Sequence, residues 1–354
     1  MEGVQLRRTF AFWTVRIVTL EAARIGKWAP DQGVGRPRAE LTIHRSWWWP
    51  RDNRGAVPPT NDRMEVPTIM RAFTPEVGDV VWAAFEPLIP VPIDTHPLGV
   101  HRRRKSDRDC YAVMLVRLVT GCSWEDAERL CGNKVSDTTV RSRRDEWIAA
   151  GVFDKLETEA IAAYDKIVGL CFDDVAVDGS LHKSPCGGEG TGPNPTDRGK
   201  LGWKWSILTD RNGIPVGVAI DGANRNDSVM LAPTLDDANR MGLLQEIETL
   251  WLDRGYDSQA TLERLAERDI ADAVIAKKRK RGTTGGMKKN QPMGLRWPVE
   301  RTNSWLSNFG QLRRNTDRKT SHRLAQLALA IVFLLTAKLI DWKNRWSPTS
   351  VPIR

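Results

Sequence analysis

The chain has 354 residues, with 53 Lys and Arg against 44 Asp and Glu, a formal net charge of +9 and a pI near 9.5. This length allows two or three domains, and the basic balance favours a polyanionic partner. The five cysteines show no CxxC spacing and no HExxH occurs, which argues against a disulfide framework, a zinc ribbon and histidine-based zinc catalysis, and for a reducing compartment.

Residues 1–69 show no sustained hydrophobic period and contain several prolines, which predicts an irregular or disordered extension. Trp47–Trp49 run directly into Pro50, and a regular helix cannot continue through that proline. The segment is interpreted as a tail, or as sequence translated from too early a start codon with the true start at Met64 or Met70. The alternative is a DNA-binding arm. We expect the segment to be dispensable for activity.

Residues 70–165 predict an all-α domain with helices near 74–90, 106–121, 123–132 and 136–151. The last three segments open with Ser and close at Gly, which are helix start and stop signals. A short turn separates the last two, as in a helix-turn-helix that binds DNA. In this interpretation Arg141, Arg143 and Arg144 of the second helix contact phosphates or bases. A plain helical bundle is the alternative.

From residue 166 the pattern changes to alternating strands and helices. Strands are expected at 166–178, 204–210, 214–221, 247–253 and 271–277, with helices at 228–242 and 258–269 and further helices after the last strand. Arg211-Asn212-Gly213 predicts a hairpin turn between the second and third strands. This order is typical of an RNase H-like mixed α/β sheet with flanking helices, over 166–346, followed by a tail at 347–354.

Three acidic residues stand out within this predicted domain. Asp178 and Asp253 end predicted strands, and Glu300 lies on a predicted helix. Two strand ends and one helix can bring three carboxylates together, and converging carboxylates hold Mg²⁺ or Mn²⁺. A turn or cap role is the alternative for each Asp taken alone. Asp257 is interpreted as such a helix cap.

Basic residues concentrate around the third carboxylate. Positions 277–319 hold thirteen Lys or Arg and two acidic residues. An acidic metal site beside such a surface indicates phosphodiester chemistry on nucleic acid. The run Lys277, Lys278, Arg279, Lys280 and Arg281 is interpreted as a basic loop over DNA, with a solvated charge run as the alternative. The apolar run at 324–340 is interpreted as a buried terminal helix rather than a membrane span.

The sequence resembles bacterial insertion-sequence DDE transposases of the group named after insertion sequence five. Five motifs carry the resemblance, namely DGSLHKSP at 178–185, GPNPTDRGK at 192–200, DGANRNDS at 221–228, LDRGYDS at 252–258 and RWPVERTNSWL at 296–306. The resemblance covers about 70–345. It implies a catalytic, metal-binding triad of Asp178, Asp253 and Glu300, and makes Arg296 part of the signature around the glutamate.

Two positions depart from the pattern of the group. Ser307 stands where a basic residue is frequent, seven positions after Glu300, and Met293 stands where a Tyr is frequent. Because those positions contact phosphates in related transposases, we expect Arg301, Arg313 or Arg314 to supply such contacts here.

The resemblance implies a DNA transposase that binds terminal inverted repeats and catalyses metal-dependent strand cleavage and strand transfer. It implies two Mg²⁺ or Mn²⁺ ions, with Asp178 bridging both, and double-stranded DNA, at the element ends and the target, as partner. It also implies a homodimer on DNA and a cytoplasmic, nucleoid-associated location with no membrane. The alternatives are an RNase H-like nuclease without strand transfer and an inactive DNA-binding regulator.

Two smaller groups of residues keep two interpretations each. Asn224, Asn226 and Asp227 either orient the active site or DNA, or shape the turn between a strand and a helix. Trp297 and Trp305 either stack on a base or belong to the core.

Overall fold

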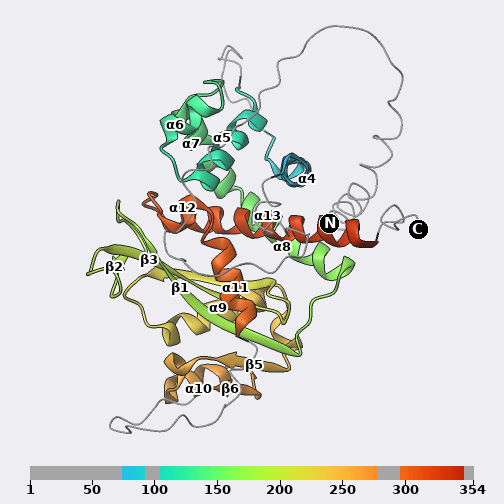
Figure 1. Ribbon diagram of the computed structural model, residues 1–354, viewed down its shortest axis with the longest axis vertical. Coiled ribbons are helices and arrows are strands. Elements are labelled where there is room, and N and C mark those ends of the chain that lie inside the picture. The colour runs from blue at the N-terminus through green and yellow to red at the C-terminus, as the bar shows by residue number, and fades with distance from the viewer. Residues whose placement is uncertain (1–73, 92–103, 277–295, 347–354) are drawn as a thin grey trace, which may run out of the picture.

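The computed structural model describes residues 74–91, 104–276 and 296–346. In Figure 1 a lobe of helices lies at one end and a β-sheet at the other, with the long helix α13 (Thr320–Trp346) between them. The predictions for residues 1–69, for the basic run 277–281 and for the tail at 347–354 lie outside the described residues.

The helical lobe consists of α4 (Pro75–Phe85), the 3-10 turn η2 (Glu86–Leu88), α5 (Asp107–Thr120), α6 (Trp124–Leu130), α7 (Asp137–Ala149) and α8 (Val152–Ile167). The predicted start signals are confirmed, because the side chains of Thr74, Ser106, Ser123 and Ser136 each accept a hydrogen bond from the backbone N–H three residues on. The helix α8 was not predicted, and it fills the segment before the expected first strand.

The remaining elements are β1 (Asp174–Lys183), β2 (Gly192–Pro193), β3 (Leu201–Thr209), β4 (Pro215–Gly222), α9 (Asp227–Arg240), η3 (Leu244–Glu246), β5 (Thr249–Leu252), η4 (Arg254–Tyr256), α10 (Gln259–Ala266), β6 (Ala273–Ile275), α11 (Trp297–Leu306), α12 (Gly310–Arg313) and α13 (Thr320–Trp346). The predicted order of long strands and helices is confirmed, as is the mixed sheet. The strands run β2-β3-β1-β5-β6, with β4 also on β3.

The first strand differs from its prediction. It begins at Asp174 rather than 166, because α8 continues to Ile167, and it runs five residues past Asp178. Antiparallel pairing with β3 extends from Ala176 to Lys183, so β3 supplies backbone partners beyond the expected end of the strand. Asp178 therefore lies inside β1 and not at its end, which corrects the prediction.

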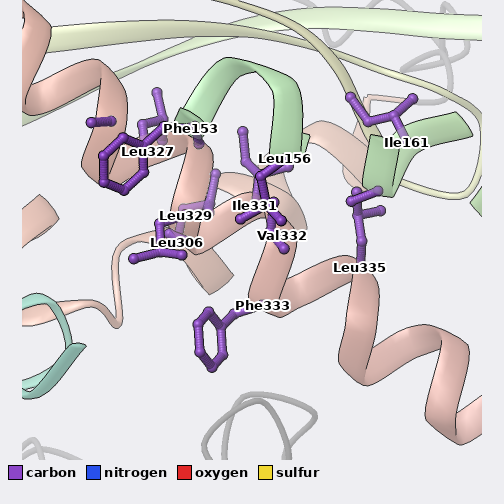
Figure 2. Packing of buried hydrophobic residues seen from close by; sticks show 14 of the residues in the cluster. Phe153, Leu156, Ile161, Leu306, Leu327, Leu329, Ile331, Val332, Phe333 and Leu335 are labelled. Carbon is purple, nitrogen blue, oxygen red and sulfur yellow. The ribbon is translucent and has the colours of Figure 1, made fainter. Parts of the chain in front are cut away.

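The long helix α13 is the centre of the core. Figure 2 shows its side chains Ile331, Val332 and Leu335 beside Leu156 and Ile161 of α8. The helix is long and apolar enough to cross a membrane, but 78% of its most apolar window is buried inside the protein. This agrees with the predicted buried terminal helix. One continuous core cluster joins the helical lobe to the sheet.

Candidate active site

Asp178 is held on β1 by an amide from α11. The Asn303 side-chain amide donates to Oδ2 of Asp178 at 3.2 Å, and its oxygen accepts from the Trp205 indole at 2.8 Å. Burial raises the pKa of Asp178 to about 6, against the opposing effects of Arg296 and of the Gly179 backbone N–H. The carboxylates of Asp253 and Asp227 raise it further. The raised pKa of Asp178 is thus chiefly an effect of burial, to which the neighbouring carboxylates add.

Asp253 follows β5 directly, as predicted, and caps the turn η4. Its Oδ1 accepts the backbone N–H of Gly255 at 2.6 Å. Strands β5 and β1 are parallel, and Trp251 lies beside Ala176. Because Asp253 and Asp178 each come two residues after that pair, the register brings them to the same level on neighbouring strands. The structure therefore brings the first two predicted acids together.

Glu300 lies in the first turn of α11, as predicted, and its side chain is 58% exposed. The Arg296 guanidinium lies between it and the sheet, 3.6 Å from Glu300 Oε1 and 3.8 Å from Asp178 Oδ1. A single cationic side chain thus links the first and third acidic residues.

The residues at this site fit a hard divalent cation by their chemistry. They offer carboxylate oxygens, the ligands that Mg²⁺ and Mn²⁺ prefer, and a positive group already lies between two of them. Within the described ranges, however, no three His, Cys, Asp or Glu side chains are close enough together to hold a metal ion. The carboxylates of Asp178 and Glu300 are bridged by Arg296 instead.

A buried ion pair on the opposite face of β1 was missed from the sequence. Lys204 of β3, 5% exposed, donates to Asp227 Oδ1 at 2.7 Å. The pair packs against Gly179, where a Cβ would come within 2.3 Å of that oxygen. Asp227 therefore lies against the backbone next to Asp178. A signal was present in the sequence, since Lys204 interrupts an apolar strand between two tryptophans.

Tyr256 completes the buried surroundings of the acids. It is 1% exposed, and burial raises its pKa well above the ordinary value, with the charges of Asp227, Asp178 and Asp253 adding to the effect. Its phenol is thus kept protonated next to the carboxylates.

The neighbouring polar residues have local roles. Asn226 caps α9 by accepting from the Ser228 N–H at 3.0 Å, which supports the turn-shaping interpretation for that residue. Asp174 accepts from the Trp251 indole at 2.8 Å. The helix α10 is capped by Ser258 rather than by the predicted Asp257.

The three arginines predicted to bind DNA from α7 do not share one environment. Arg141 is exposed and pairs with Asp137 at 2.8 Å. Arg143 and Arg144 are only 5% and 7% exposed, and they pair with Asp107 and with Asp317 respectively. The sequence pattern does not distinguish these two from Arg141, because the buried face of α7 combines the core residues Val140 and Trp147 with arginines that pair with carboxylates.

Arg301 lies between the two tryptophans of α11. Its guanidinium carbon is 4.3 Å from the Trp297 ring centre and 4.6 Å from that of Trp305. It also donates to the Asn212 carbonyl at 2.7 Å. Trp297 is 54% exposed, whereas Trp305 is half-buried. Arg313 and Arg314 are exposed at the end of α12.

Two family descriptions match the chain. "Transposase DDE domain" matches residues 170–335, and "Putative transposase of IS4/5 family" matches residues 77–157. The chain belongs to the IS4/5 family of DDE transposases. The first match contains Asp178, Asp253 and Glu300, and the second contains α5, α6 and α7.

Two relatives of this transposase come from one element of Burkholderia cepacia. The "Putative transposase for insertion sequence element IS402" is 41% identical over 144 residues, which are 39% of this chain and 65% of the relative. The "Insertion element IS402 uncharacterized 16.2 kDa protein" is 34% identical over 123 residues, 34% of this chain and 82% of the relative. No solved structure matches the chain significantly.

Proposed function

We propose that this transposase binds the terminal inverted repeats of an insertion sequence and catalyses metal-dependent strand cleavage and strand transfer. The observation that carries the proposal is the register of β1 and β5, which brings Asp178 and Asp253 to one level beside Glu300 and Arg296. Such an arrangement of carboxylates suits phosphodiester chemistry.

In the proposed mechanism Asp178, Asp253 and Glu300 would hold two divalent cations, Mg²⁺ or Mn²⁺. Such ions would supply activation of the attacking hydroxyl and stabilisation of charge on the leaving oxygen. Asn303 fixes the orientation of the Asp178 carboxylate by its hydrogen bond. Arg296 favours the ionised form of Asp178, and its guanidinium is placed to transfer from the carboxylates to a DNA phosphate.

The DNA contacts are proposed at exposed or partly exposed basic residues near the acidic residues and on α7. Arg296, Arg301, Arg313 and Arg314 lie on or next to α11 and α12, and Arg141 lies on α7 in the proposed helix-turn-helix of α6 and α7. The basic run 277–281 precedes α11 in the sequence and belongs to the same proposal. Arg143 and Arg144 are assigned to the interior instead, because their partners are intramolecular carboxylates. We further propose a homodimer on DNA in the bacterial cytoplasm, associated with the nucleoid.

The test is cleavage of a duplex that carries the element end, with Mg²⁺ and with Asp178→Asn as the variant. We expect end cleavage to be abolished while DNA binding and fold are kept, because an amide does not hold the ions comparably. Asp173→Asn is the control, since Asp173 is exposed and forms only a surface ion pair at 3.5 Å with Arg211. Unchanged cleavage by Asp178→Asn would remove Asp178 from the mechanism.

Two outcomes with the wild-type protein distinguish the alternatives. Cleavage of the end without joining to target DNA indicates a nuclease that lacks strand transfer. Binding without any cleavage in Mg²⁺ or Mn²⁺ indicates a regulator.

A further inference from the structure

Six exposed basic residues from two distant segments of the chain meet near the end of β1 that lies beyond the catalytic carboxylate. They are Lys183, Arg198, Lys200, Arg314, Arg318 and Lys319, and we refer to them as the basic ridge. Lys183 pairs with Asp197 at 3.7 Å. Among the described residues the other five form no ion pair, so their charges are available to a partner.

Backbone contacts fix the two segments against each other. Arg314 forms an isolated parallel bridge with Lys183, and the N–H of the next residue, Asn315, donates to the Lys183 carbonyl at 2.9 Å. The Glu189 N–H donates to the Arg318 carbonyl at 2.8 Å. Gly188 is so close to Arg318 that a Cβ would lie 2.2 Å from that carbonyl oxygen. The spacing of the ridge is therefore set by the fold rather than by free loops.

A buried guanidinium braces the loop that carries half of the ridge. Arg323 of α13 is fully buried and donates to the carbonyls of Gly187 at 3.0 Å and Asp317 at 2.7 Å, and to that of Glu189. Burying an arginine against backbone carbonyls costs free energy. Here the buried arginine fixes the conformation of the loop that carries Arg314, Arg318 and Lys319, although this loop contains none of the three acidic residues proposed for catalysis. We infer that the conformation of the loop matters for function.

The distance between the ridge and the active site can be compared with the spacing of phosphates along DNA. Lys183 lies five residues beyond Asp178 on one strand, which at a strand rise of about 3.3 Å per residue is roughly 17 Å. A B-form duplex advances about 3.4 Å per base pair, so for a duplex that runs along β1 this distance corresponds to roughly five base pairs. We propose that the basic ridge binds the phosphate backbone of the element-end duplex about five base pairs from the phosphate held at Asp178.

This inference rests on the proposed function, since it takes the DNA end to lie at Asp178. Phosphate contacts of this kind carry no sequence information, so the ridge positions the duplex and leaves recognition to other residues. The ridge also supplies basic side chains in addition to Arg314, which is its one member that the sequence predicts to contact phosphates.

The experiment compares two charge-matched triple variants of the full chain. The ridge variant carries Arg198→Asn, Lys200→Ala and Arg318→Ala. Asn is chosen at Arg198 because that residue has a left-handed φ of 54°, which Asn tolerates. The control carries Lys155→Ala, Arg211→Ala and Arg240→Ala. These three exposed basic residues lie on α8, on the β3–β4 turn and on α9.

Two readouts are made, the salt dependence of binding to the element-end duplex and hydroxyl-radical footprinting of the complex. Each lost phosphate contact lowers the slope of log affinity against log salt by about 0.9, so the ridge variant should lose roughly 2–3 in slope. It should also lose backbone protection about five base pairs from the cut. The control should keep the wild-type slope and footprint.

The outcomes separate this proposal from the proposed function. If the wild-type protein does not bind the end duplex, the proposed function fails. If it binds and the folded ridge variant shows an unchanged slope and footprint, the ridge proposal alone is overturned. Loss of strand transfer with unchanged end binding also overturns it, and assigns the ridge to target DNA. Circular dichroism and thermal unfolding establish that both triple variants are folded.

Discussion

At the scale of single residues, Asp178 is placed where its charge opposes folding. Its pKa is raised from 3.8 to about 6, so ionising this carboxyl at neutral pH destabilises the folded protein. For an acid whose folded pKa is raised, the cost is absent below the unfolded pKa and complete above the folded one. The cost therefore develops between about pH 4 and pH 6.

This sign predicts that Asp178→Asn, the variant expected to lose cleavage, is more stable than the wild type. Without divalent metal at pH 7.5, Asp178→Asn should raise the free energy of unfolding by up to about 3 kcal/mol. The gain should shrink as the pH falls towards 4. Urea unfolding in EDTA at several pH values measures it, and equal stability of the two proteins at pH 7.5 would contradict the pKa assignment.

How far the sequence predicted the site depends on the kind of residue. Asp253 and Glu300 lie on the expected elements, because a motif and its local structure both depend on neighbouring residues. Asn303 and Lys204 were missed, because their roles arise only when α11 and α9 pack on opposite faces of β1. The Asn303 contact has no local signal, whereas Lys204 stands out in the sequence as a charged residue between two tryptophans of an apolar strand.

At the scale of elements, the junction of α5 and α12 depends on two glycines. A Cβ at Gly310 would lie 2.4 Å from the Thr120 carbonyl oxygen, and one at Gly121 would lie 2.7 Å from the Gly310 carbonyl carbon. Gly121 also has a left-handed φ of 72° as the cap of α5. The helices can approach this closely only because neither residue has a side chain.

We therefore expect Gly310→Ala to destabilise the protein by about 1–3 kcal/mol through the forced displacement of backbone. Gly78→Ala is the matched control, since Gly78 lies inside α4 and a Cβ added there would have nothing within 4 Å. In an open helical site Ala should stabilise by roughly 0.5–1 kcal/mol. Thermal unfolding of both variants measures whether the two changes in stability have opposite signs. Unchanged stability of Gly310→Ala would mean that α5 and α12 move apart at little cost in free energy.

The element boundaries that differ from prediction around residue 166 have a common cause. The segment 166–173 is apolar enough to begin a strand, but its first two residues close α8. A short apolar run fits either a buried helix end or a strand, and only packing decides. Pairing with β3 likewise decides where β1 ends.

At the scale of the whole molecule, one carboxylate joins the helical lobe to the connection between α12 and α13. Asp317, between α12 and α13, accepts from Arg117 of α5 at 2.9 Å and from Arg144 of α7 at 3.2 Å. All three side chains are less than a tenth exposed. Removing the carboxylate leaves two buried guanidinium groups without their shared partner.

Asp317→Asn should therefore cost about 3–5 kcal/mol of unfolding free energy. The control is Asp79→Asn, which removes an exposed ion pair with Arg108 at 2.7 Å and should change stability by less than about 1 kcal/mol. Urea unfolding followed by circular dichroism compares them. A similar small effect for both variants would show that the buried network is dispensable.

The shared core also predicts that the helical lobe does not fold by itself. α4 and α8 pack on α13, and Arg117 and Arg144 depend on Asp317, so a fragment of residues 74–168 lacks these partners. We expect this fragment to show no cooperative thermal unfolding, in contrast to the full chain. A sharp transition in the isolated fragment would mean that the lobe is an independent domain, as the sequence boundary at 165 suggests.

The central position of α13 has a consequence for how the protein is made. It is the last described helix to leave the ribosome, yet it completes the core for α4 and α8, which emerge much earlier. Until then the apolar faces of those helices have no partner, and the nascent chain needs protection from aggregation. A gene copy interrupted before codon 320 would therefore yield unfolded protein that is degraded, rather than a shortened protein that competes for element ends.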